Sequence, residues 1–208
     1  MKVLFITDYD YTNPRLRSGV PYFLVHGLKE AGIIHNVLVV ADARSIGQKL
    51  LSRFKQFLCK HGLLGSAGFY DASYGKAMAK SYAKFWRTIN FGDYDFVMSI
   101  KPQLLAFLPI EVKAVLWIDN TIQSYALYPE MKDISSMSLK EGAEIEAIVF
   151  KRANKIFTAS LWLKQYILSQ MPMLSSTIHV LPRGANLPEF PVFHEVELAI
   201  SKRLQSKR

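Results

Sequence analysis

Residues 1–41 read MKVLFITDYDYTNPRLRSGVPYFLVHGLKEAGIIHNVLVVA, and this stretch predicts a strand, a helix and a second strand in that order. The apolar run Val3–Thr7 contains β-branched residues and stops at a charged residue, which is typical of a buried strand. Residues 19–31 favour a helix that ends before Gly32, a residue that readily adopts the left-handed conformation. Residues 35–41 predict a second apolar strand, as in parallel sheets that helices cover on both faces.

The same alternation of strand and helix continues along the rest of the chain. Further strands are expected at residues 95–100, 114–119, 155–160 and 177–181, and helices between them at about 121–127, 138–153 and 160–170. The spacing of Ser138 and Glu141 predicts a capping box, and Ser160 is expected to cap the helix that follows it. The whole pattern predicts an α/β fold, an open and mostly parallel doubly wound sheet with helices on both faces.

Two consecutive stretches repeat apolar residues at steps of three and four, with basic residues between them, and each predicts an amphipathic helix. The first has Leu50, Leu51, Phe54, Phe57 and Leu58, with Lys49, Arg53, Lys55 and Lys60. The second has Met78, Tyr82, Phe85, Trp86 and Ile89, with Lys76, Lys80, Lys84 and Arg87. A glycine-rich loop is expected between them, at residues 62–75.

The composition narrows the class of protein. The chain has 208 residues, of which 26 are Lys or Arg and 17 are Asp or Glu, and half are apolar. These fractions exclude a disordered chain, a collagen-like repeat and a disulfide scaffold, and they fit one α/β domain of the larger kind. The single cysteine, Cys59, cannot form an internal disulfide, which indicates either a reducing compartment or a protein that is indifferent to redox conditions. With neither a spanning segment nor a signal segment expected, the predicted location is the cytoplasm.

The positive charge is concentrated in residues 43–90, which hold nine basic side chains and one acidic side chain, Asp71. A sequence pI near 9.6 is typical of nucleic-acid-binding proteins. This block, however, has no zinc-finger spacing, no aromatic RNA-binding motif and no obvious recognition helix, so we expect no nucleic-acid partner. The five histidines have no short metal-binding spacing, so we expect no metal site.

Ligands of open parallel sheets bind beyond the carboxyl ends of the strands, so the residues after each strand are candidates for chemistry. Ser18 and Gly19 open a helix whose backbone N–H groups could approach an anion; alternatively, Ser18 only caps the helix and Gly19 only turns the chain. Asp119 could accept a proton from a hydroxyl nucleophile, although capping of the next helix is the preferred interpretation of this residue alone. Arg183 could pair with a phosphate or lie in solvent.

Five motifs follow one another along the chain: SGVPY at 18–22, LWIDNT at 116–121, EAIVFKRA at 146–153, KIFTASLW at 155–162 and IHVLPRGAN at 178–186. Together they resemble the N-terminal domain of family 4 glycosyltransferases, which have the GT-B fold. The resemblance extends over about residues 2–188. It implies a Rossmann-like, acceptor-side domain at residues 1–188, followed at 189–208 by a basic tail or the start of an interdomain linker.

The resemblance also implies a function, namely the acceptor-binding half of a retaining glycosyltransferase with a nucleotide-sugar as donor substrate and no metal or other cofactor. By analogy, Asp119 is the catalytic residue at the acceptor hydroxyl, and Ser18 and Gly19 bind the donor phosphates. The acceptor, a glycan or a lipid-linked molecule, is bound by Asn120, Thr121 and Arg183. The chain has one glycine where many members have a pair, and it lacks the donor domain, so it is expected to be inactive alone.

Two other functions are compatible with these features. A non-catalytic half would recruit the acceptor or act as a scaffold through a partner chain. An epimerase of the same two-domain fold would change the sugar of a nucleotide-sugar without any acceptor.

The basic block has its own interpretation within this resemblance. Family members that glycosylate lipid-linked acceptors often dock on membranes through a basic and apolar region of this domain. Lys49, Arg53, Phe54 and Phe57 are therefore predicted to face an anionic membrane at its inner surface. The alternative is an ordinary amphipathic helix whose apolar stripe packs on the sheet while its lysines face water.

Overall fold

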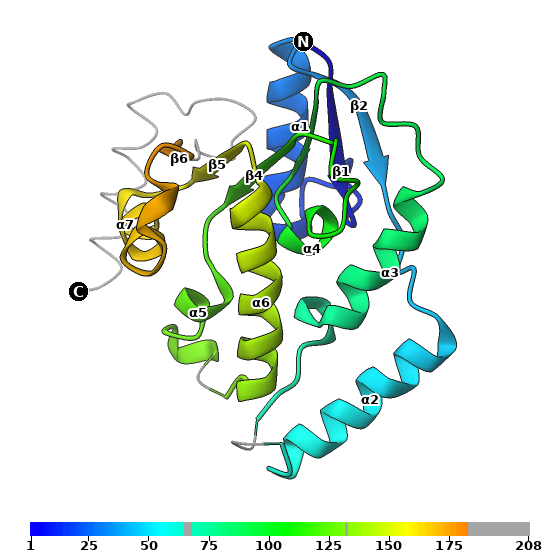
Figure 1. Ribbon diagram of the computed structural model, residues 1–208, viewed down its shortest axis with the longest axis vertical. Coiled ribbons are helices and arrows are strands. Elements are labelled where there is room, and N and C mark those ends of the chain that lie inside the picture. The colour runs from blue at the N-terminus through cyan, green and yellow to red at the C-terminus, as the bar shows by residue number, and fades with distance from the viewer. Residues whose placement is uncertain (65–67, 132, 183–208) are drawn as a thin grey trace, which may run out of the picture.

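The computed structural model describes residues 1–64, 68–131 and 133–182, which fold around one six-stranded sheet (Figure 1). The strands are β1 (Val3–Thr7), β2 (Ile34–Val39), β3 (Phe96–Ser99), β4 (Ala114–Ile118), β5 (Lys155–Thr158) and β6 (Ile178–Val180). The α-helices of the described residues are α1 (Val20–Glu30), α2 (Ile46–Lys60), α3 (Lys76–Trp86), α4 (Pro102–Leu105), α5 (Ile122–Tyr125), α6 (Ser136–Arg152) and α7 (Leu161–Gln170). Each strand that the sequence predicts is present.

All neighbouring strands of the sheet are parallel, in the order β2-β1-β3-β4-β5-β6. The chain therefore runs outward from β1 to β2 and then crosses to β3 on the other side of β1. That reversal is the topological switch point of a doubly wound sheet, where such folds bind their ligands. The expected α/β fold, Rossmann-like and parallel, is confirmed.

Helices cover the sheet in two layers of unequal size. On one face, Val25 of α1 packs with Val3, Phe5 and Met98 of the strands. On the other face a larger core joins the strands to α3, α4, α6 and α7, and it includes the fully buried Leu104 of α4. The helix α4 was not expected from the sequence, because its four residues are too few for a helical period to show.

The residues at the helix ends can be compared with the capping residues that the sequence predicts. Gly32, after α1, has a φ of +67°, as expected of a left-handed residue, and the side chain of Ser160 accepts a hydrogen bond from the backbone N of Leu163. The expected capping box of Ser138 and Glu141 is wrong, because α6 begins two residues earlier and its N-cap is Ser135. Glu141 is thereby placed within the helix, where it contacts other elements.

The two amphipathic helices are present but pack differently. The helix α3 buries Ala79, Tyr82 and Trp86 in the core, whereas α2 buries only Ser52 and Cys59. The alternative in which the apolar stripe of α2 packs on the sheet is therefore wrong. The expected loop at 62–75 is interrupted by a short 3-10 helix, Ala72–Tyr74. Among the described residues, no helix has both the length and the apolar character needed to cross a membrane.

Candidate functional site: a cleft at the strand ends

A cleft of about 340 Å³ lies at the carboxyl ends of β1, β3 and β4, beside the switch point. It is lined by Tyr9, Val20, Ser73, Tyr74, Ile100, Lys101, Pro102, Gln103, Ile118, Asp119, Asn120, Thr121, Tyr125 and Glu146. The structure thus brings together three of the predicted site residues, Asp119, Asn120 and Thr121, which follow β4 directly. A cleft at this place is the position expected for ligands of a doubly wound sheet.

The segment after β4 presents the Asp119 side chain to the cleft without using it as a helix cap. The N-cap of α5 is Thr121, whose Oγ1 accepts a hydrogen bond of 3.0 Å from the backbone N of Ser124. Ser124 Oγ in turn accepts one of 2.9 Å from the backbone N of Thr121. The interpretation of Asp119 as the cap is therefore wrong. Asp119 is exposed, and the neighbouring Asn120 accepts a 3.5 Å hydrogen bond from the hydroxyl of Tyr128.

The backbone conformation and the close packing at the start of α1 require a glycine at position 19. Gly19 is the N-cap of α1, with a φ of +76°, and a Cβ there would lie 2.8 Å from the ring of Phe23 and 2.9 Å from the carbonyl oxygen of Pro14. Any side chain at this position would meet both strain and a clash. Gly19, and not Ser18, holds the capping position, and the next residue, Val20, lines the cleft. The proposed contact with donor phosphates stays a prediction.

Lys101 and Asp8 form an ion pair beside the cleft that the sequence reasoning missed. Lys101 Nζ lies 2.6 Å from Asp8 Oδ2 and 4.2 Å from the centre of the Tyr9 ring. Asp8 directly follows β1, and Lys101 lies two residues beyond β3. Ligands of such sheets bind beyond the carboxyl ends of the strands, and this rule predicts both residues when it is applied to β3 as well as to β1 and β4.

Glu146 is a third residue that sequence reasoning missed as part of a site. It belongs to α6, is 5% exposed, and accepts a hydrogen bond of 2.7 Å from the backbone N of Ile122. Burial raises the pKa of its carboxyl to about 8, opposed only in part by that N–H group. Glu146 is the first residue of the motif at 146–153, but the sequence does not indicate its burial or its place on the cleft wall, because a glutamate between apolar helix positions is usually exposed.

The described wall of the cleft is rich in side chains that form hydrogen bonds. Of the described residues that line it, only Lys101 is basic, and its charge is already paired with Asp8. Tyrosine rings, the amides of Gln103 and Asn120, and carboxyl groups make up much of the remaining wall. Such groups offer both donors and acceptors for hydroxyl groups, whereas a polyphosphate would meet little uncompensated positive charge from the described residues of the wall.

The other predicted site residues lie elsewhere. Arg183 is outside the described residues. The predicted membrane-facing residues are on α2, which extends along the outer side of α3 (Figure 1). In the described part of the chain, no three His, Cys, Asp or Glu side chains are grouped so that they could hold a metal ion.

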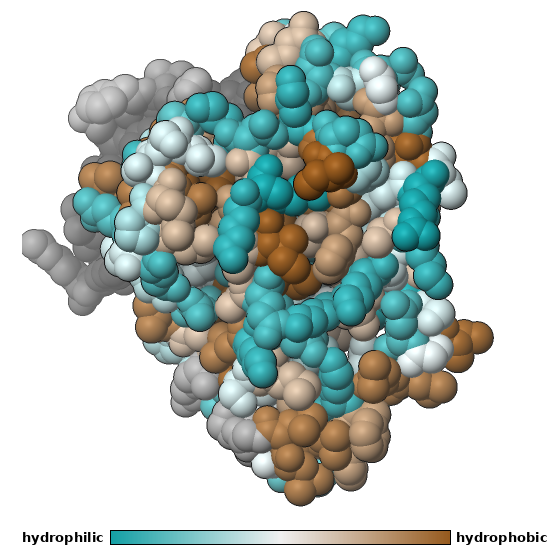
Figure 2. Space-filling view, viewed as in Figure 1, coloured by the Kyte–Doolittle hydropathy of each residue, from teal (hydrophilic) through white to brown (hydrophobic). Residues whose placement is uncertain are grey.

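The helix α2 exposes its apolar side chains to solvent. Their exposed fractions are 57% for Leu50, 57% for Phe54 and 55% for Phe57. The hydrophobic colour gathers along the lower edge of the molecule over α2 (Figure 2). The helix contains four basic residues and no acidic one, and Arg53 is exposed beside the two phenylalanines.

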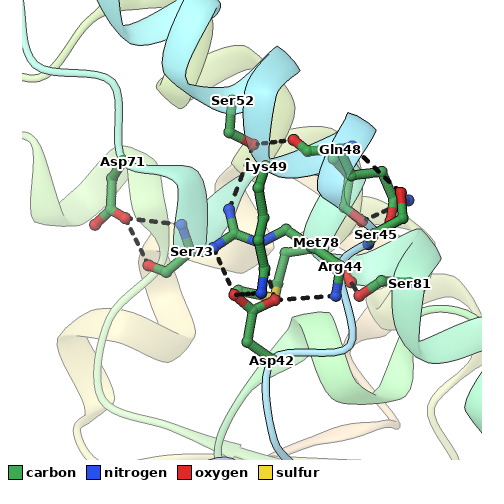
Figure 3. Close-up of polar contacts among 11 residues, drawn as sticks. Asp42, Arg44, Ser45, Gln48, Lys49, Ser52, Asp71, Ser73, Met78 and Ser81 are labelled. Atoms are coloured by element: carbon green, nitrogen blue, oxygen red, sulfur yellow. Dashed lines mark hydrogen bonds and ion pairs between the residues drawn. The ribbon is translucent and has the colours of Figure 1, made fainter.

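Polar contacts hold the opposite side of α2 to the rest of the protein. The guanidinium of Arg44 donates two hydrogen bonds of 2.9 Å to Asp42 and one of 3.3 Å to the hydroxyl of Ser52 (Figure 3). Lys55 pairs with Glu141 of α6, and Gln48 Nε2 donates to the carbonyl oxygen of Ala77 in α3. The apolar face is therefore directed outward by bonds on the other side of the helix.

Comparison of the chain with protein-family models and with curated proteins gives no match.

Proposed function

We propose that this protein is the acceptor-binding half of a nucleotide-sugar-dependent glycosyltransferase. The observation that carries the proposal is the cleft at the ends of β1, β3 and β4, with Asp119 on its wall and a lining that suits hydroxyl groups. The paired state of Lys101 supports an acceptor site rather than a site for the donor diphosphate. The nucleotide-sugar would then be bound by a second, donor-binding domain.

In this proposal Asp119 acts at the acceptor hydroxyl. A carboxylate within hydrogen-bond reach of a nucleophilic hydroxyl can accept its proton as the acceptor oxygen bonds to the anomeric carbon of the sugar. The bond from that carbon to the donor diphosphate breaks in the same transfer, and the nucleoside diphosphate leaves. The capping box of Thr121 and Ser124 fixes the backbone that carries Asp119, because both of its hydrogen bonds are buried. Thr121 thereby orients the segment in addition to any contact with the acceptor.

The test is glycosyl transfer by the chain combined with its donor-binding domain. Asp119→Asn is expected to lower turnover by about 10²- to 10⁴-fold, because the amide cannot accept the proton. The substitution keeps the shape of the side chain, so the melting temperature should not change. Unchanged turnover would remove Asp119 from the reaction, and absence of any transfer would contradict the glycosyltransferase. Conversion of the nucleotide-sugar without an acceptor would favour the epimerase instead.

We further propose that the exposed face of α2 binds an anionic membrane surface. Phe54 and Phe57 would enter the headgroup region, while Lys49 and Arg53 would contact the anionic headgroups. Lys49 also lies 3.9 Å from Asp42, but half of its side chain remains exposed. Such a surface would bring a lipid-linked acceptor to the enzyme.

Sedimentation with vesicles of phosphatidylcholine and phosphatidylserine tests this surface. The double substitution Lys49→Glu and Arg53→Glu should weaken binding by at least about tenfold, and binding should weaken with added salt. The matched control, Lys80→Glu with Lys84→Glu, makes the same charge change on exposed residues of α3. Equal loss in both variants would mean that net charge alone, and not the α2 surface, causes binding.

A further inference from the structure

Glu146 lies at the junction of two cavities. It lines the cleft at the strand ends and also a second cavity of about 260 Å³ between α5, α6 and α7. Thr121 is the other residue that both cavities share. Phe150, Ile167 and Met171 form an apolar part of the wall of the second cavity. Glu146 is therefore part of the wall that a ligand in either cavity would contact.

The hydrogen bonds of Glu146 are incomplete for a buried carboxyl group. Within the described residues, its Oε1 accepts from the N of Ile122, whereas its Oε2 has neither a hydrogen bond nor an ion pair. Glu141, five residues earlier in α6, accepts from Lys55, from the Tyr70 hydroxyl and from the N of Lys76. Oε2 is not among the fully buried atoms that lack a partner, so it is open to the cleft, where the hydroxyl group of a ligand can take the place of water as its partner.

We propose that Oε2 of Glu146 hydrogen-bonds a hydroxyl group of an uncharged, polyhydroxylated ligand in the cleft. The inference rests on the proposed acceptor site and names a further residue of that site together with its ligand class. An anionic ligand is disfavoured because Asp119 is on the same wall and Lys101 is already paired. A ligand without the matching hydroxyl group would leave a buried polar group unpaired, which makes Glu146 a source of specificity.

The protonation state of Glu146 is suited to hydrogen bonding with a hydroxyl group. With a pKa of about 8, the carboxyl group is mostly protonated at neutral pH, so it has one O–H donor as well as acceptor capacity. It can then donate to a hydroxyl oxygen or accept from a hydroxyl proton. A carboxylate at this place would only accept.

The inference is tested with the whole chain and two uncharged probes, methyl β-D-glucopyranoside and myo-inositol, by saturation-transfer NMR. Glu146→Ala is expected to weaken binding of the better probe by about tenfold, since it deletes one buried hydrogen bond. Glu146→Gln should stay within about threefold of the unchanged chain, because its amide both donates and accepts. The matched control is Glu144→Gln, a change at a more exposed residue of the same helix that pairs with Lys76.

A second measurement decides the question even where Glu146→Ala fails to fold. In protein labelled with ¹³C at the glutamate carboxyl groups, the Glu146 resonance should titrate near the pH of its raised pKa. A probe that prefers the protonated form should raise that pKa by about one unit at ten times its Kd. A resonance that the probe leaves unmoved, or equal binding by Glu146→Ala, would overturn the inference. If neither probe binds the unchanged chain, the inference is also overturned, whereas glycosyl transfer with the donor domain still decides the proposed function.

Discussion

The helices α2 and α3 have nearly the same pattern of apolar and basic residues, but only α3 contributes to the core. Tyr82 and Trp86 of α3 are each 1% exposed, whereas more than half of Phe54 and Phe57 in α2 is exposed. Amphipathic periodicity therefore shows that a helix has an apolar face, but it does not show what covers that face. In α3 this face packs into the core with α4 and α6, whereas in α2 it is exposed to solvent.

The two helices should differ most in how much their aromatic side chains contribute to the free energy of unfolding of the protein. Trp86→Ala should lower the free energy of unfolding by about 3–5 kcal/mol, because it removes a large buried side chain and leaves a cavity. Phe57→Ala should change it by less than about 0.5 kcal/mol, because the ring is exposed. Urea unfolding of the two variants checks both values. A large loss for Phe57→Ala would mean that the apolar face of α2 is covered in solution.

Substitution of Glu141 is expected to have an intermediate effect on the free energy of unfolding, because this residue contacts both α2 and α3. It pairs with Lys55 of α2 and accepts a 3.0 Å hydrogen bond from the N of Lys76 at the start of α3. Glu141→Gln should cost about 1–3 kcal/mol, since partners of a buried group lose their charged acceptor. Hydrogen exchange should accelerate more in α2, which has little other packing, than in α3. Equal acceleration in both helices would contradict the view that polar contacts anchor α2.

Glu141 should also make the stability of the protein fall as the pH becomes acidic. Burial acts to raise the pKa of Glu141, but the hydrogen bonds from Lys55, Tyr70 and Lys76 outweigh it and lower the pKa below its usual 4.5. The contribution of Glu141 to stability is therefore complete above pH 4.5 and is lost as the pH falls through the lowered pKa. Unfolding experiments between neutral pH and pH 3 should show this loss in the unchanged chain and not in Glu141→Gln.

A smaller loss of stability than for Glu141→Gln is expected from a substitution at the start of α2. Ser45 and Gln48 form a reciprocal capping box there, whereas the N-cap of α3 is Gly75, which has no side-chain cap. Ser45→Ala should cost about 1 kcal/mol, measured by urea unfolding, and should lower the helicity of α2 in NMR chemical shifts. Unchanged shifts at residues 46–49 would show that the tertiary contacts of α2 suffice to start the helix.

The sequence predicts most of the fold because buried parallel strands are short apolar runs, such as Val3–Thr7, that end at polar residues. The sequence also predicts part of the candidate site at the strand ends. Asp119 and its neighbours follow a strand, so the strand-end rule places them in the cleft. Glu146 could not be found this way, because its role depends on how α6 packs against α5. Gly142 permits that packing, since a Cβ there would lie 2.9 Å from Ile122.

The division between acceptor and donor halves is tested most directly by calorimetric titration of the chain with UDP, GDP and their sugars, with and without anionic vesicles. We expect vesicle binding and no nucleotide affinity in the micromolar range, because Lys101, the one lysine among the described residues that line the cleft, is paired with Asp8. Micromolar binding of a nucleotide by the chain alone would mean that the cleft is a self-sufficient nucleotide site. That result would contradict the assignment of the cleft to the acceptor.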